Sequence, residues 1–137
     1  MNRRHLFLAG LTGLGIVAAA ATAMAFAPAA APAPVAFDRA AFEQAQAADK
    51  RILVDIHAPW CPTCRAQEPI IQRLAAARGN ESLVVFRVDF DSQKNDVRAF
   101  GAQRQSTLIA YRGSRETGRL VGDTDPGRIA ALVASSR

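Results

Sequence analysis

The chain has 137 residues, a length that accommodates one domain. It carries 17 Lys and Arg residues against 12 Asp and Glu, for a formal net charge of +5. The basic residues are scattered, without runs of like charge or interleaved aromatic residues. This composition argues against a surface that binds nucleic acid.

The first 25 residues have the pattern of a signal peptide. Arg3 and Arg4 precede an uncharged, alanine-rich apolar stretch over residues 6–25. This stretch ends in Ala23-Met24-Ala25, which fits the small-residue rule for cleavage. We therefore expect residues 1–25 to direct export and to be removed.

Two features of this leader leave its processing open. The arginine pair resembles a twin-arginine export signal, but Asn2 precedes it and no Lys follows, so Sec export is equally compatible. The apolar stretch is also close to the ~20 residues that a membrane helix needs, so an uncleaved anchor is an alternative. In either case we expect the domain to work in the periplasm, free or held at the inner membrane.

Residues 26–36 are expected to form a linker rich in Ala and Pro. Alternating Ala and Pro over residues 28–34 favour an extended polyproline II chain without a packed core. Order is expected to begin near Phe37. Residues 37–137 then form the domain, and about 100 residues bury enough apolar surface to fold independently.

Helix and strand signals alternate through this domain. Asp38 and Asp125 are candidate N-caps, and Pro126 suits a first helical turn. Gly79-Asn80 is expected to end a helix in a left-handed conformation. The expected elements are a short helix after Asp38, a strand over 51–57, a helix from 62 to about 78, a strand over 82–89, a short helix over 95–100, a hairpin of strands 107–112 and 116–121, and a last helix after Asp125.

Residues 52–64 include the only two cysteines of the chain. A buried strand leads through a short break to Cys61, which is expected at a helix N-terminus with Pro62 in the first turn. Unpaired N–H groups and the helix dipole favour a thiolate there. Cys64 lies one helical turn further on, so the pair interconverts between dithiol and disulfide with little backbone movement. A structural disulfide is the alternative, but so short a loop removes little chain entropy.

The sequence around the cysteines resembles the thioredoxin family, whose active site runs strand, Trp-Cys-x-x-Cys, long helix. The likeness covers roughly residues 37–137 with almost no gaps. The matching positions are Asp55, Trp60-Cys61-Pro62-Thr63-Cys64, Pro69, residues 87–91, residues 106–111 and Val121-Gly122. The resemblance implies an α/β, thioredoxin-like fold with a central mixed β-sheet of four to five strands flanked by helices.

The resemblance also implies catalytic roles. Cys61 would be the exposed nucleophile that attacks a partner's disulfide, and Cys64 would resolve the mixed disulfide. Asp55, an acid in an apolar strand, is expected to have a raised pKa and to take the proton of Cys64. The alternative is that Asp55 only caps a neighbouring amide. Arg87 stands where the family often has a lysine, and would lower the pKa of Asp55 if it reached that carboxyl.

Six residues are expected to contact partner proteins: Trp60, Pro62, Thr63, Gln105, Ser106 and Thr107. Ser106 departs from the family pattern, in which a cis-proline stands at this position. A cis bond before a residue other than proline costs about 2.5–4 kcal/mol, so we expect Gln105–Ser106 to be trans. Serine adds a hydroxyl near both sulfurs, which can hydrogen-bond a thiolate, alter partner choice or let a metal approach.

Together these features predict an exported thiol–disulfide oxidoreductase, acting more as a reductase than as an oxidant on cysteines of partner proteins. No cofactor or bound metal is expected, the chain is expected to be a monomer, and a membrane protein is expected to donate or accept the electrons. The main alternative is a module that binds Cu or Zn through Cys61, Cys64 and His57. A third is an interaction domain that kept the motif without catalysis.

Overall fold

The computed structural model describes residues 33–137, so the predicted signal peptide and most of the predicted linker lie outside it. The strands in this part of the chain are β1 (Val35–Ala36), β2 (Arg51–His57), β3 (Leu83–Asp89), β4 (Thr107–Arg112) and β5 (Arg115–Val121). They form one five-stranded sheet in the order β1-β3-β2-β4-β5. Neighbouring strands are parallel from β1 to β2 and antiparallel from β2 to β5, so the sheet is mixed, as predicted.

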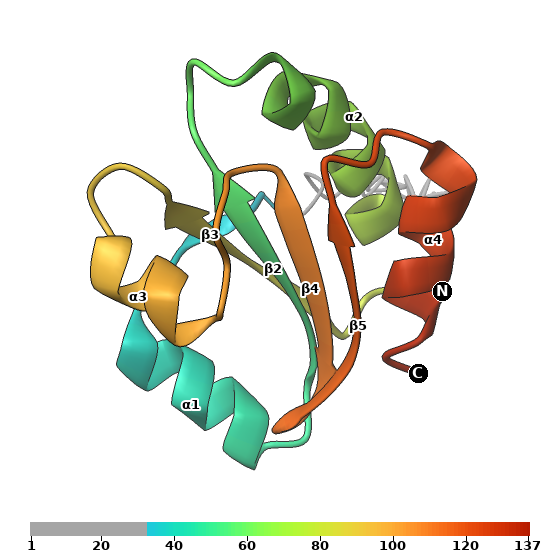
Figure 1. Cartoon of the computed structure of the whole chain (residues 1–137). Coiled ribbons are helices and arrows are strands. Elements are labelled where there is room, and N and C mark those ends of the chain that lie inside the picture. Colours follow the sequence, from blue (N-terminus) through green and yellow to red (C-terminus); the bar gives the residue numbers. More distant parts are fainter. Residues whose placement is uncertain (1–32) are drawn as a thin grey trace, which may run out of the picture.

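Helices cover both faces of this sheet. They are α1 (Arg39–Ala47), α2 (Pro62–Ala76), α3 (Lys94–Ala99) and α4 (Pro126–Ala134). α1 and α3 lie on one face, and α2 and α4 on the other (Figure 1). The predicted α/β class is confirmed. Of the helices within residues 33–137, none is long and apolar enough to cross a bilayer.

β2 is the central strand because its apolar run is buried on both faces. Ile52, Val54 and Ile56 point into the core beneath α1 and α3, whereas Leu53 points into the core beneath α2 and α4. Side chains alternate along a strand, so Asp55 lies on the same side as Leu53. The buried acid therefore faces the layer that contains α2.

Both predicted N-caps are confirmed. Asp38 Oδ1 accepts a hydrogen bond from the N–H of Ala41 at 2.8 Å, and Asp125 Oδ1 accepts one from the N–H of Arg128 at 2.7 Å. At the start of the domain, β1 brings Val35–Ala36 of the expected linker into the sheet, paired with β3. A strand of two residues is too short to show an alternating pattern.

The end of α2 differs from the prediction. The helix ends at Ala76, and its C-cap Ala77 has extended backbone angles, φ −72° and ψ 146°. Gly79 does have a positive φ of +84°, but it lies in the turn after the helix and does not form the cap. The Arg51 guanidinium donates to the carbonyl of Gly79 at 2.8 Å and so helps to fix this turn.

Candidate active site

Cys61 and Cys64 lie where β2 leads into α2. Cys61 is the N-cap residue of α2, and its Sγ accepts a hydrogen bond from the backbone N–H of Cys64 at 3.1 Å. Both thiols are free, so this is the reduced dithiol. The same N–H and the dipole of α2 would stabilise a thiolate on Cys61.

The expectation that Cys61 is exposed is wrong for this dithiol state. Cys61 and Cys64 are each 1% exposed, because the cap turns the Cys61 sulfur back toward its own helix. The two cysteines cluster with Ala58, and the half-buried Phe90 packs against them. Trp60, by contrast, is 54% exposed. A partner's sulfur therefore needs a local movement, such as rotation of Phe90, to reach Cys61.

The pKa values of the two thiols move in opposite directions. Burial acts to raise the pKa of Cys61, but hydrogen bonds from Cys64, Ser106 and the Thr63 backbone hold it below its ordinary value of 9.0. Burial, the hydrogen bond to Cys61 and the negative charge there raise the pKa of Cys64 to about 11. Cys61 is thus the thiol that ionises first, which suits a nucleophile.

Ser106 lies in the loop between α3 and β4, and the peptide bond before it is trans, as predicted. Its φ of +56° is left-handed, which is uncommon for a residue other than glycine. Both backbone groups are engaged: the N–H donates to the Ile56 carbonyl and the carbonyl accepts from the Gly122 N–H, each at 2.8 Å.

The Ser106 hydroxyl has one proton and two neighbouring acceptors. In the dithiol it donates to the carbonyl of Gln105 at 2.6 Å. The hydrogen bond from this side chain that lowers the pKa of Cys61 needs the same proton. The hydroxyl therefore serves either the carbonyl or the sulfur, but not both at once.

Asp55 is buried next to two half-buried charged residues, Arg87 and Glu68. Its Oδ2 accepts a hydrogen bond from Arg87 Nε at 3.1 Å, and Arg87 also donates to Glu68 on α2 at 3.1 Å. His57 Nδ1 lies 3.9 Å from the same Asp55 oxygen. Burial raises the pKa of Asp55, and the nearby Arg87 and His57 offset only part of that increase. The expected raised pKa is therefore present, although Arg87 does reach the acid.

The second oxygen of Asp55 is available to a proton. Oδ1 is buried and has no hydrogen-bond partner within the described residues. The carboxyl therefore does not cap an amide through this atom, which was the alternative role considered from the sequence. A buried carboxylate oxygen without a hydrogen-bond donor lowers the stability of the fold. The same oxygen is able to accept a proton.

Gln67 is a site residue that the sequence analysis did not identify. It is fully buried, and its Nε2 donates to the carbonyl of Ser106 at 3.3 Å and to that of Asp123 at 2.8 Å. It ties α2 to the Ser106 loop and to the segment before α4. Its position in the sequence could have indicated this role. Gln67 follows Cys64 by three residues and so lies on the same buried face of the helix, where a polar residue needs hydrogen-bond partners.

The residues expected to contact partners differ in accessibility. Trp60 is exposed, and its indole Nε1 donates to Asp91 at 2.7 Å, which fixes the ring beside the cysteines. Pro62 is exposed, while Thr63 and Gln105 are half-buried. These four residues remain predicted contacts of a partner protein.

The Thr107 side chain is not accessible to a partner protein, so the prediction that it contacts partners is corrected. It is 1% exposed, and its backbone pairs with both β2 and β5. Its hydroxyl donates to the carbonyl of Arg104 at 2.8 Å, so the side chain fixes the loop instead. Ser106 is also buried, at 4% exposed, and its contact with a partner stays a prediction.

The alternative metal site is not assembled. Within residues 33–137, no three His, Cys, Asp or Glu side chains group so as to hold a metal ion. His57 pairs with Asp55 at the end of β2 and does not complete a ligand set with the two thiols.

Comparisons with known proteins agree with this geometry. The family model described as thioredoxin matches residues 33–135. A thioredoxin of Alicyclobacillus acidocaldarius subsp. acidocaldarius is 31% identical over 93 residues, covering 68% of this chain and 88% of that protein. Thioredoxin-2 of Saccharomyces cerevisiae is 29% identical over 90 residues, covering 66% and 84%. The crystal structure of Trxlp from Edwardsiella tarda EIB202 superposes with a TM-score of 0.69 at 40% identity, covering 72% and 98%.

Proposed function

Because the chain belongs to the thioredoxin family, we propose that it reduces disulfides of partner proteins outside the cytoplasm. Its reaction class, thiol–disulfide oxidoreduction of the thioredoxin type, follows from that membership. The direction, the compartment and the exchange with partners are the proposal.

The first step is attack by the Cys61 thiolate on one sulfur of the partner's disulfide. The partner's S–S bond breaks, a mixed disulfide forms at Cys61, and the departing sulfur takes a proton. The lowered pKa of Cys61 supports this assignment, because the thiolate is the attacking species. The local movement at Phe90 precedes the attack, since the sulfur is buried in the dithiol.

The second step is attack by Cys64 on the Cys61 sulfur of the mixed disulfide. The bond between Cys61 and the partner's sulfur breaks, and that sulfur leaves as a thiolate and takes a proton. The partner is thus released as a dithiol that has gained two electrons, and Cys61 and Cys64, which have lost them, are joined as a disulfide. With a pKa raised to about 11, the Cys64 thiol needs a base at neutral pH. Asp55 suits this role because its pKa is raised by burial and it lies in the layer beneath α2.

The observation that carries the direction is the surroundings of the Cys61 sulfur. The groups that lower its pKa are the Cys64 thiol and N–H, the Ser106 hydroxyl and the Thr63 backbone, all of them uncharged. Strongly oxidising relatives stabilise the reduced state with a very acidic thiol, of pKa about 3.5. Uncharged hydrogen bonds stabilise the thiolate less, so they favour a reductant.

The compartment and the electron supply are inferred from the sequence pattern. The basic start and apolar stretch of residues 1–25 support export to the periplasm, with a membrane anchor as the alternative. A reductant in an oxidising compartment needs a dithiol donor to reduce Cys61–Cys64 again, and a membrane protein is the expected source. We propose that the domain acts as a monomer on such partners.

Insulin reduction driven by excess dithiothreitol tests the proposed function. The wild type should turn over, and Cys61→Ser should reduce the rate to that of dithiothreitol alone. Incubated with insulin in the absence of dithiothreitol, Cys64→Ser should instead accumulate a mixed disulfide, seen as a heavier band on a non-reducing gel. Full activity in Cys61→Ser would show that the assignment of the nucleophile is wrong.

A further inference from the structure

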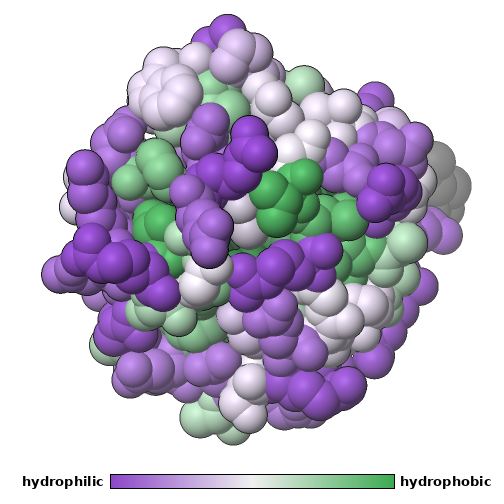
Figure 2. All heavy atoms as spheres, in the orientation of Figure 1, coloured by the Kyte–Doolittle hydropathy of each residue, from purple (hydrophilic) through white to green (hydrophobic). Residues whose placement is uncertain are grey.

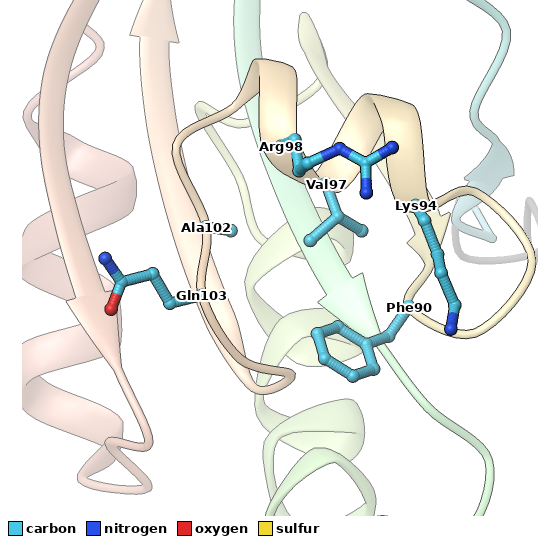
Figure 3. Close-up of a pocket in the computed structure, with 6 residues that line it drawn as sticks. All are labelled: Phe90, Lys94, Val97, Arg98, Ala102 and Gln103. Carbon is cyan, nitrogen blue, oxygen red and sulfur yellow. The ribbon is translucent and has the colours of Figure 1, made fainter.

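A groove lies next to the cysteines, between α3 and the loop that precedes β4. It has a volume of about 400 Å³. The six residues that line it are Phe90, Lys94, Val97, Arg98, Ala102 and Gln103. In Figure 3, Lys94, Val97 and Arg98 extend from α3, and Ala102 and Gln103 come from the loop on the opposite side of the groove.

This groove is continuous with the redox site. Phe90 lines it and also packs against the cluster of Ala58, Cys61 and Cys64. The loop wall at Ala102 and Gln103 runs on to Gln105 and Ser106, and the Ser106 side chain lowers the pKa of Cys61. A partner whose sulfur is joined to Cys61 therefore places the neighbouring residues of its chain at the mouth of the groove.

The groove combines an apolar floor with positive charge. Phe90, Val97 and Ala102 supply the apolar part, while Lys94 and Arg98 are exposed on α3. No acidic residue lines the groove. On the face of the molecule drawn in Figure 2, hydrophobic surface occurs in patches bordered by hydrophilic side chains.

The positive charges of the groove are not neutralised within the described residues. The nearby carboxylates have other partners: Asp89 accepts from Ser92, Asp91 accepts from Trp60, and Asp96 pairs with Arg39. No ion pair in residues 33–137 engages Lys94 or Arg98. An acidic side chain of a partner would thus meet two available cations beside an apolar surface.

We propose that this groove binds the segment of the partner next to its reacting cysteine, and that it selects segments in which an acidic residue adjoins an apolar one. The apolar side chain packs on Phe90 and Val97, and the carboxylate lies between Lys94 and Arg98. This inference rests on the proposed reduction of partner disulfides and adds the chemistry of the preferred partner.

Three disulfide-linked peptides test the preference. They share one sequence except for the pair next to cysteine, which is Glu-Leu, Gln-Leu or Lys-Leu. Their reduction, with dithiothreitol as the final reductant, gives kcat/KM for the full chain. We expect Glu-Leu to exceed Lys-Leu by about five- to tenfold, the order expected of two partly exposed ion pairs. Raising the salt concentration should narrow this ratio.

Two double variants separate the groove from the overall charge. Lys94→Glu/Arg98→Glu should reverse the preference, and Lys94→Gln/Arg98→Gln should bring the ratio close to one. The matched control is Arg73→Glu/Arg78→Glu, which changes the net charge equally at the far end of α2. Arg73 lies in the last turn of its helix, as Arg98 does. The control should keep the wild-type preference.

The outcomes distinguish the groove from the proposed function. If Gln-Leu is reduced efficiently but the three peptides do not differ, or if the control loses the preference as much as the groove variants do, the acidic selection is wrong. If no peptide is reduced above the rate of dithiothreitol alone, the proposed function itself fails. A preference that only the groove variants change would establish the site.

Discussion

Two thiols one helical turn apart behave differently because only one of them caps the helix. The Cys61 sulfur accepts a hydrogen bond from the N–H of Cys64 in its own helix, and Ser106 also lowers its pKa, whereas burial and the charge that Cys61 acquires raise the pKa of Cys64. At the scale of single residues the site is thus a set of hydrogen bonds around one sulfur, together with a buried acid in the layer below.

The contribution of Ser106 can be isolated with glycine. Ser106→Gly removes the hydroxyl, while glycine adopts the φ of +56° without strain, so the fold should change by no more than about 1 kcal/mol. The pKa of Cys61 should rise, because a hydrogen bond to the thiolate is lost. The measurement is the rate of Cys61 alkylation by iodoacetamide against pH.

Thr63→Ala is the control for this experiment. Thr63 stabilises the thiolate through its backbone, so loss of its hydroxyl should not change how the alkylation rate depends on pH. An unchanged profile in Ser106→Gly would mean that the hydroxyl stays on the Gln105 carbonyl and does not serve the sulfur.

Asp55→Asn should make the protein more stable at neutral pH. Burial raises the pKa of Asp55 in the folded state, so between the ordinary value of 3.8 and the raised value only the unfolded chain releases this proton. The free energy of unfolding therefore falls as pH rises through that interval, and asparagine removes the loss. Urea unfolding from pH 3.5 to 8 should show that the free energy of unfolding of the variant rises relative to that of the wild type as pH increases.

The opposite trend would show that the ion pair with Arg87 outweighs burial. In the same variant, the mixed disulfide should persist longer at neutral pH, because Cys64 has lost its base.

At the scale of elements, the sequence predicts what local chemistry decides. The caps at Asp38 and Asp125, the apolar run of β2 and the break before Cys61 each depend on a few adjacent residues, and the structure has the elements there. Contacts between side chains of distant segments are harder to predict, because no short sequence pattern marks them. Gln67 joins three segments, and the cluster of Cys61 and Cys64 packs against Phe90, which follows β3.

Arg51 is an example of such a distant partner. It begins β2, yet it is 4% exposed and donates to Ser136, to the carbonyl of Gly79 and to that of Val133. It thereby joins the sheet to the turn after α2 and to the end of α4. A pattern of apolar residues along the strand gives no sign of these contacts.

Arg51→Met should therefore destabilise the fold by about 2–4 kcal/mol, since it removes three hydrogen bonds that a buried guanidinium makes to distant segments. Urea unfolding measures the loss. The matched control is Arg73→Met on the exposed face of α2, which should change stability by less than about 0.5 kcal/mol. A loss in Arg51→Met no larger than in the control would show that water replaces the guanidinium without cost.

At the scale of the whole molecule, the fold gathers the reactive residues at one end of the sheet. β2 ends beside the start of α2, β3 ends just before Phe90, and β4 begins after Ser106, so three neighbouring strands meet around the cysteines. The ends of parallel strands are where α/β proteins place their sites. Hydrophobic cores on both faces of the sheet support this edge, and the groove lined by Phe90 lies beside it.

The most direct test of the account is the equilibrium potential of the Cys61–Cys64 couple against glutathione. A sulfur stabilised only by uncharged hydrogen bonds should give a value below roughly −250 mV, as expected of a reductant that a membrane donor keeps reduced. A potential near −120 mV would mark an oxidant and would contradict the proposed direction of the reaction.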